Sequence, residues 1–296
     1  MFDSLSPALN RRQSLAGGSA AVAAALIAQL SRRAIAQTSG GMRFGLVTYQ
    51  WGKDMSLAEV ISSCEESGVL GVELRTEHKH AVEPSLSRME RAEVRKRFAD
   101  SSVELVGYGS NCEFHSDDPA KVKQNIEQAK AYIELMHDCG GSGVKVKPNG
   151  FPKGLSREKT IEQIGKSLNE VAEFGQKYGQ KIRVEVHGSG TCELPAMRDI
   201  FEVADHRNVY VCWNSNDQDT NGEGLEANFR MVQDRIGDTV HVRELDAGDY
   251  PYDQLFKLFQ QMNYEGWILL EARTNPVNKV QALLEQRHLF EKMSAG

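Results

Sequence analysis

The middle of the chain reads Lys181-Ile182-Arg183-Val184-Glu185-Val186-His187-Gly188, and this stretch predicts a short buried strand that ends in a carboxylate and an imidazole. Strand side chains alternate between two faces, so Arg183, Glu185 and His187 share one face and the valines share the other. Two groups able to bind a metal or move protons, at the end of an apolar strand, indicate a functional site.

Seven similar apolar runs accompany this stretch from residue 42 onward, and each is followed by a helical segment. We expect strands at 44–49, 69–74, 103–108, 144–147, 181–187, 209–213, 239–243 and 267–271. Helices are expected to open at Ser56 as an N-cap and at Asp118-Pro119, and the second of these to stop at Gly140-Gly141. Eight strand–helix pairs predict a single-domain (β/α)8 TIM barrel. An open doubly wound sheet is the weaker alternative, because no G-x-G-x-x-G motif opens the first helix.

The N-terminal segment has the features of an export signal. Arg11-Arg12 precedes an apolar run over 15–30, and Ala34-Ile35-Ala36 then offers a cleavage site before Gln37. A twin-arginine pair is an export address, and the run is shorter than the roughly 20 residues that span a membrane. We predict a Tat-type signal peptide at 1–36, recognition by the Tat machinery, a periplasmic or secreted protein, and no stable membrane insertion. A cytosolic protein with an amphipathic leader is the alternative.

The mature part, 37–296, has 260 residues, which suits one barrel of about 250 residues. Removal of residues 1–36 takes away four Arg and one Asp, so the formal net charge changes from −6 for the whole chain to −9 for the mature part. This acidity excludes a nucleic-acid-binding role. The five cysteines are scattered and lack C-x-x-C spacing, so neither a zinc ribbon nor a disulfide framework is expected, and most should be small buried residues.

Polar residues gather where the expected strands end, the place where barrels of this type carry their chemistry. One such residue alone is more often a solvated rim residue, but the excess at one end of the barrel indicates a site. Glu185 and Glu271 should face each other across the mouth, as two-sided proton transfer or a divalent cation requires. The strand-end set is Tyr49, Trp51, Glu73, Arg75, Tyr108, Asn111, Lys145, Lys147, Glu185, His187, Asn214, Asn216, Asp217, His241, Arg243, Glu244, Glu271 and Arg273.

Several of these residues are candidates for binding a substrate. Tyr49 and Trp51 suit either the core or stacking on a sugar ring, and both interpretations stay open. Lys145 and Lys147 share a face, and one of them is expected to be structural, satisfying carboxylates such as Glu73. The predicted substrate-binding set is Tyr49, Trp51, Lys145, Lys147, His187 and Arg273.

Four strand-end motifs together resemble those of the xylose isomerase-like TIM barrels, the sugar phosphate isomerase/epimerase family. The resemblance covers 42–291 and rests on Gly71-Val72-Glu73-Leu74, Val184-Glu185-Val186-His187, Val240-His241-Val242-Arg243-Glu244-Leu245-Asp246 and Ile268-Leu269-Leu270-Glu271. It implies a divalent metal held by Glu, Asp, His and Glu on strands 5 to 8, with the two Glu also forming the acid/base pair.

Glu185 and Glu271 match that implied set, whereas the other two positions depart from it. The strand-6 Asp falls on Asn214, and the strand-7 His, counted three before Asp246, falls on Arg243. An Arg has no lone pair to give, and its charge repels a nearby cation by about 4 kcal/mol. Either a Mn, Co, Mg or Zn ion is held off-centre or Arg243 replaces it as the electrophile. The candidate metal ligands are Glu185, Asn214, His241 and Glu271, with His187 as a further candidate.

The sequence thus predicts an exported carbohydrate isomerase or epimerase with Glu185, Glu271 and Arg243 as catalytic residues. A lyase that cleaves keto-glycosides by elimination is the first alternative, and a non-catalytic sugar-binding barrel is the second. A nuclease is excluded, because the mature chain is acidic and the several His of a trinuclear metal site are missing.

Overall fold

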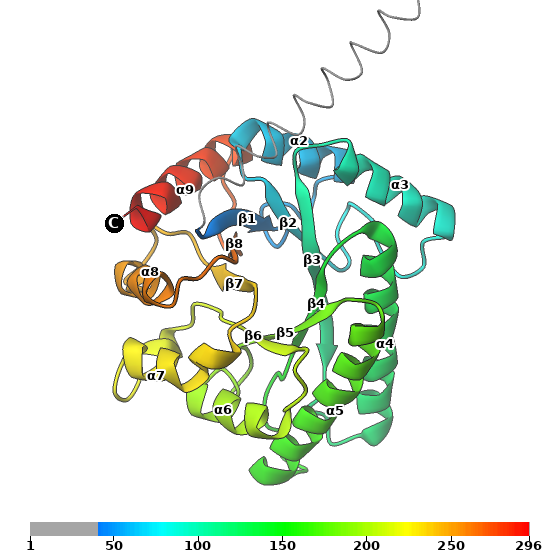
Figure 1. Cartoon of the computed structure of the whole chain (residues 1–296), viewed down its shortest axis with the longest axis vertical. Helices are drawn as coiled ribbons and strands as arrows, with labels where there is room; N and C mark the ends of the chain where they lie inside the picture. Colours follow the sequence, from blue (N-terminus) through cyan, green and yellow to red (C-terminus); the bar gives the residue numbers. More distant parts are fainter. Residues whose placement is uncertain (1–40, 296) are drawn as a thin grey trace, which may run out of the picture. The chain divides into compact units, whose positions relative to one another are not determined.

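The computed structural model describes residues 41–295, in which eight parallel strands alternate with eight α-helices. The strands hydrogen-bond in the order β6-β5-β4-β3-β2-β1-β8-β7. Two isolated parallel bridges, Val211–Ile236 and Asn214–His241, connect the β6 edge with the β7 edge. The sheet therefore closes into a barrel ringed by helices (Figure 1), which confirms the predicted single (β/α)8 domain.

The elements follow the expected order, with ends that differ by a few residues. The strands are β1 (Arg43–Val47), β2 (Gly71–Arg75), β3 (Glu104–Glu113), β4 (Gly143–Lys147), β5 (Lys181–Glu185), β6 (Val209–Cys212), β7 (Thr239–Val242) and β8 (Trp267–Leu270). The helices are α2 (Leu57–Ser67), α3 (Arg88–Ala99), α4 (Pro119–Cys139), α5 (Arg157–Lys177), α6 (Leu194–Val203), α7 (Leu225–Val232), α8 (Tyr252–Gln261) and α9 (Lys279–Ser294).

Helix ends lie where the capping residues predict them. The Ser56 hydroxyl accepts a hydrogen bond from the Glu59 backbone NH, and the Glu59 carboxylate accepts one from the Ser56 backbone NH, so a capping box starts α2. Asp118 caps α4, with Pro119 in its first turn, and Gly140 ends that helix at φ +89°. These three predictions are confirmed.

Strand β3 is longer than predicted, because it continues past Tyr108 to Glu113. The extension passes through Gly109, where a Cβ atom would lie 2.5 Å from Cδ of Arg75 and 2.8 Å from Oε1 of Glu73. A glycine here leaves room inside the barrel for two charged side chains from β2, and the added residues bring Asn111 to the strand's carboxyl end.

The shared face of Arg183 and Glu185 points into the barrel interior. Arg183 is fully buried and binds Asp238 through Nε and Nη2, while Nη1 donates to the Val106 carbonyl. An ion pair thus fills the amino-terminal part of the interior, and Glu185, two residues later, lies at the opposite end of the same strand.

Four of the five cysteines are buried and Cys192 is half-buried, all as free thiols. Within residues 41–295, no helix is both long and apolar enough to cross a membrane. The predicted signal peptide lies outside the described residues.

Candidate functional site

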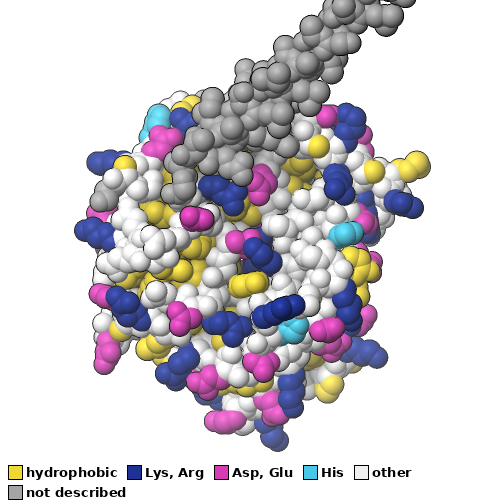
Figure 2. All heavy atoms as spheres, viewed as in Figure 1, with side chains coloured by type: hydrophobic (Ala, Val, Ile, Leu, Met, Phe, Trp, Pro, Cys, Tyr) yellow, Lys and Arg dark blue, Asp and Glu magenta, His cyan; other side chains and the backbone are white. Residues whose placement is uncertain are grey.

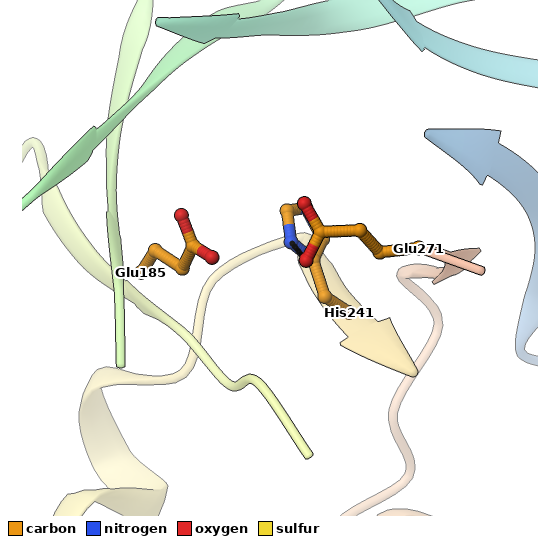
Figure 3. A group of neighbouring side chains, drawn as sticks. All are labelled: Glu185, His241 and Glu271. Atoms are coloured by element: carbon orange, nitrogen blue, oxygen red, sulfur yellow. Dashed lines mark ion pairs between the residues drawn. The ribbon is translucent and has the colours of Figure 1, made fainter. Parts of the chain in front are cut away.

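Three side chains that could bind a metal converge at the carboxyl ends of β5, β7 and β8. Glu185 is the last residue of β5, His241 lies in β7, and Glu271 directly follows β8. Figure 3 shows the three side chains pointing toward a common centre, and one ligand atom from each lies within 4.8 Å of the others. Glu185 and His241 are buried, whereas Glu271 is half-buried.

His241 is held between two carboxylates. Its Nε2 lies 3.3 Å from Oε1 of Glu73, and its Nδ1 lies 3.7 Å from Oε2 of Glu271. Burial alone would lower the pKa of His241, but neighbouring Cys212 and Glu73 raise it well above its ordinary value. Burial also opposes ionisation of Glu73, yet His241 lowers the pKa of this carboxyl. Glu73 and His241 are therefore electrostatically coupled in the barrel interior, with Nε2 of the ring toward the Glu73 carboxylate.

Glu185 is ionised because a buried cation contacts it. Lys145 is fully buried and donates from Nζ to Oε2 of Glu185, while Nδ2 of Asn214 donates to Oε1 at 3.1 Å. Burial would raise the pKa of Glu185, but Lys145, and after it His241, lower the pKa below its usual range. An anionic oxygen at this point is what a proton acceptor or a metal ligand needs.

Glu271 has a basic partner from β2, the strand on the far side of β1 from β8. Arg75, at the end of β2, places Nη1 3.4 Å from Oε1 of Glu271 and Nη2 3.3 Å from Oδ1 of Asn111. Both glutamates therefore lie next to one cation each, which offsets the repulsion between two carboxylates at close range.

The donor set fits a divalent cation. His241 is fully buried, and neither of its ring nitrogens makes a regular hydrogen bond within the described residues. An imidazole with one nitrogen toward a buried carboxylate and the other toward further ligands matches the carboxylate–histidine–metal arrangement of many proteins. Asn214 lies beside Glu185, and rotation of its amide would offer a neutral oxygen. The residues that would hold the ion are Glu185, His241, Glu271 and Asn214.

Arg243 occupies a different place from the one that the motif count gave it. His241, rather than Arg243, joins the two glutamates. Within the described residues, the carboxylate that Arg243 contacts is Asp217, with 3.1 Å between Nη1 and Oδ1. The sequence could not distinguish the two residues, because His241 and Arg243 are two positions apart and share a strand face. Their different depth along the barrel axis appears only in the structure.

The two aromatic candidates differ in exposure. Trp51 is 3% exposed, and its Nε1 donates to the Thr274 carbonyl at 3.1 Å, so it belongs to the core. Tyr49 is half-buried, and its ring lies 5.5 Å from the Arg75 guanidinium. Of the two, only Tyr49 combines partial exposure with a contact to the site.

His187 is fixed by a chain of polar contacts. Its Nδ1 lies 2.8 Å from Oδ1 of Asn149, and Nδ2 of Asn149 donates to the Glu113 carboxylate. A Cβ on Gly188, whose φ is +96°, would lie 2.4 Å from the Asn149 backbone, so this close approach requires glycine. Burial lowers the pKa of His187. With its proton on Nδ1, the neutral ring presents Nε2 as a hydrogen-bond acceptor.

The remaining predicted residues, Lys147 and Arg273, make no direct hydrogen bond or ion pair with the Glu–His–Glu group among the described residues. Lys147 is half-buried at the end of β4, with Nζ 3.4 Å from Oδ1 of Asn111. Arg273 is exposed, and only its backbone NH is engaged, by Glu244. The predicted site set omitted Glu73, Arg75 and Asn111. All three were among the polar strand-end residues. Glu73 and Arg75 are two positions apart and share a strand face, and this pattern could have indicated that both belong to the site.

The buried carboxyl of Asp219 connects the loop after β6 to the segment just before α8. Asp219 Oδ2 accepts from Tyr250 Oη at 2.6 Å and from the Asn216 backbone at 3.0 Å, whereas Oδ1 is buried without a hydrogen-bond partner among the described residues. Burial raises the pKa of Asp219 to about 7. The folded protein thus holds a proton on this residue that the unfolded chain gives up near pH 4.

Replacing Asp219 with Asn should change stability in a pH-dependent way. The raised pKa makes the folded state bind the extra proton between about pH 4 and pH 7, so the parent loses stability as pH rises through that window. Asn does not titrate. The stability of Asp219→Asn relative to the parent should therefore improve by roughly 2–4 kcal/mol from pH 4.5 to pH 8.5, as measured by urea unfolding. An equal difference at both pH values would contradict the assignment.

Comparisons with known proteins agree with this architecture. The chain matches the family described as "Xylose isomerase-like TIM barrel" over residues 61–292. An inosose dehydratase from Clostridium beijerinckii is 21% identical over 186 residues, which cover 49% of this chain and 62% of that protein. The match thus spans less than two thirds of that relative's length.

Two solved structures have the same fold. The apo form of 3-keto-D-glucoside 4-epimerase, YcjR, from E. coli has a TM-score of 0.71 at 15% identity, over 85% of this chain and 99% of that one. The IOLI protein with a bound zinc atom has a TM-score of 0.73 at 14% identity, over 86% of this chain and 98% of that one. At such identities the likeness shows the fold.

Proposed function

The chain belongs to the xylose isomerase-like TIM barrel family, and we propose that it is a sugar isomerase or epimerase that moves protons at a carbon next to a carbonyl. The observation that carries this proposal is the convergence of Glu185 and Glu271 on one site. Two carboxylates there allow one to remove a proton and the other to return it. The similar fold of a 3-keto-D-glucoside 4-epimerase supports the reaction class.

We assign proton removal to Glu185, which Lys145 keeps anionic and therefore able to accept a proton. It takes the proton from the carbon beside the carbonyl, and the C–H electron pair moves toward the carbonyl oxygen to give an enolate. Glu271, beside Arg75, acts in its protonated form: it delivers its proton to the opposite face of that carbon and becomes the carboxylate, and proton exchange with solvent then restores both residues. No atom is gained or lost, so the product is an epimer or isomer of the substrate.

A divalent cation, when bound by Glu185, His241 and Glu271, supplies a Lewis acid that polarises the sugar carbonyl. The IOLI structure with zinc supports such a site in this fold. Among the protein's own cations, Lys145 and Arg75 contact the two glutamates, so they are better placed than Arg243 to stabilise an enolate oxygen.

Elimination is the second candidate, favoured by the inosose dehydratase relative. Its first step is the same removal of a proton by Glu185. The electron pair then expels the group on the neighbouring carbon, and Glu271 protonates the departing oxygen, which leaves as water or as an alcohol. A non-catalytic sugar-binding barrel has no use for either proton transfer.

Incubation of keto-sugars and keto-glycosides with the protein in D2O, followed by mass spectrometry, tests these candidates. Deuterium gained from solvent in a substrate-sized product indicates isomerisation or epimerisation, whereas a smaller or split product indicates elimination. Substrates that keep all their carbon-bound hydrogen, with unchanged mass, would favour the binding protein.

We also propose that residues 1–36 direct export by the twin-arginine route. Changing Arg11-Arg12 to Lys-Lys should leave the precursor in the cytoplasm, because the route reads the arginine pair. Cell fractionation with immunoblotting measures the distribution. A matched Arg32-Arg33 to Lys-Lys change should still be exported, and export of the Arg11-Arg12 variant at the normal level would contradict the proposal.

A further inference from the structure

Two basic side chains from different strands meet at one neutral oxygen beside the Glu–His–Glu group. Nη2 of Arg75 lies 3.3 Å, and Nζ of Lys147 3.4 Å, from Oδ1 of Asn111. Arg75 ends β2, Lys147 ends β4, and Asn111 lies in the extended part of β3 between them. Basic side chains gather, with acidic ones beside them, near the middle of the face seen in Figure 2.

Two cations at this point share one carboxylate partner, because Lys147 has none of its own among the described residues. Among residues 41–295, no carboxylate lies within ion-pair distance of Lys147, and the one that reaches Arg75 is Glu271. The nearby carboxylate of Glu113, opposite Lys147 in the sheet, is engaged by Asn149. The neutral Asn111 oxygen does not neutralise Lys147, and Arg75 shares its charge between that oxygen and Glu271.

Backbone contacts fix the position of Arg75, although part of its guanidinium is buried without a hydrogen-bond partner among the described residues. Thr48 Oγ1 accepts from the Arg75 backbone NH at 2.9 Å, and His80 Nε2 contacts the Arg75 carbonyl at 2.8 Å. Nε of Arg75 is buried without a hydrogen-bond partner in the described part of the chain. Burial, and then Lys145, lower the pKa of Lys147. A fixed, partly desolvated pair of cations is stabilised when an anion binds between them.

We propose that Arg75 and Lys147 bind an anionic substituent of the substrate, a carboxylate or a phosphoryl group, which replaces the Asn111 amide as their shared partner. The inference rests on the proposed function for the identity of the site, and it makes the substrate an acidic sugar. Arg75 also contacts Glu271, so the anion lies beside the proton-transfer group and fixes the orientation of the reacting carbon. A bound divalent cation would add positive charge and favour the same class of ligand.

Binding of three sugars that differ only at C6 tests the proposal: D-fructuronate, D-fructose 6-phosphate and D-fructose. Isothermal titration calorimetry with the full chain should show that at least one of the two anionic sugars binds about tenfold or more tightly than D-fructose, as expected for hydrogen bonds between charged groups. Lys147→Gln should reduce that preference to about twofold or less, and Lys147→Arg should retain part of it. Lys153→Gln, an exposed lysine in the following loop, is the control and should keep the full preference.

The results distinguish a carboxylate subsite from a phosphoryl subsite. They also distinguish failure of the anion-binding inference from failure of the proposed function. Tighter binding of D-fructuronate identifies a carboxylate subsite, and tighter binding of D-fructose 6-phosphate identifies a phosphoryl subsite. No preference over D-fructose, a preference that Lys147→Gln retains, or no binding of either anionic sugar overturns the inference. Deuterium exchange into D-fructose without an acid preference would leave the proposed function intact, whereas an acid preference with no exchange in any keto-sugar would overturn only the proposed function.

Discussion

Replacing Glu185 with Gln should lower the rate of solvent deuterium exchange into the substrate by about 10²–10⁴-fold, the range that a positioned general base contributes. Gln keeps the size of the side chain and its contact with Asn214 but cannot accept a proton from carbon. For an isomerase or epimerase, exchange is the sharper readout, because it reports proton removal from carbon directly. Glu271→Gln should lower product formation by a similar factor.

The Glu185→Gln variant carries a second effect that a control must remove. Lys145 would be left as a buried cation without its carboxylate, and breaking such a pair typically costs about 3–5 kcal/mol of stability. A Glu185→Gln/Lys145→Met double variant removes both charges and should recover much of that stability, measured by urea unfolding. Exchange should nevertheless remain absent. Activity that returned with stability would show that Glu185 is structural and not the base.

The barrel itself could be predicted because short segments of the sequence indicate its strands and helices one by one. Each strand is a short apolar run, and several helices start at a residue such as Ser56 or Asp118 whose side chain accepts a hydrogen bond from a free backbone NH group. Strand ends were less accurate, as β3 shows. The expected strand ended at Tyr108, whereas the strand continues through Gly109, which leaves room for the side chains of Glu73 and Arg75.

The candidate site could be predicted in part. Glu185 and Glu271 each end an apolar strand, so the barrel rule alone places them at the same end. The choice between His241 and Arg243 was not available from alternation, since both point inward and only depth decides which reaches the glutamates. Trp51 posed a similar problem, because its sequence position suits both the core and the mouth.

The ion pair partners of the site depend on contacts between distant strands. One of Lys145 and Lys147 was expected to satisfy carboxylates such as Glu73. In the structure Lys145 donates to Glu185, and His241 lies against Glu73. Strand order predicts which strands are neighbours; it does not say which of several inward charges will pair across the barrel. The resulting arrangement gives Glu73 a specific role that can be tested.

Glu73→Gln should weaken divalent metal binding by about 10–100-fold, the usual effect of removing a carboxylate that orients a metal-binding histidine. Glu73 contacts Nε2 of His241, so it fixes which nitrogen is left to face Glu185 and Glu271. Chelated protein titrated with Mn²⁺, Co²⁺ or Zn²⁺ by calorimetry gives the affinity without relying on activity. His241→Asn removes a ligand itself and should weaken binding further.

A control variant shows whether a loss of metal affinity comes from losing the orientation of His241 or from a general disturbance of the fold. Glu83→Gln changes a carboxylate that binds Thr76 and the Glu77 backbone on the same side of the barrel, and it makes no contact with His241. This variant should keep the parent's metal affinity, whereas Glu73→Gln should not. If Glu73→Gln bound metal as tightly as the parent, the buried Glu73–His241 pair would serve the fold alone. If the parent bound no divalent cation after chelation and dialysis, Lys145 and Arg75 would be left as the electrophiles that stabilise the enolate.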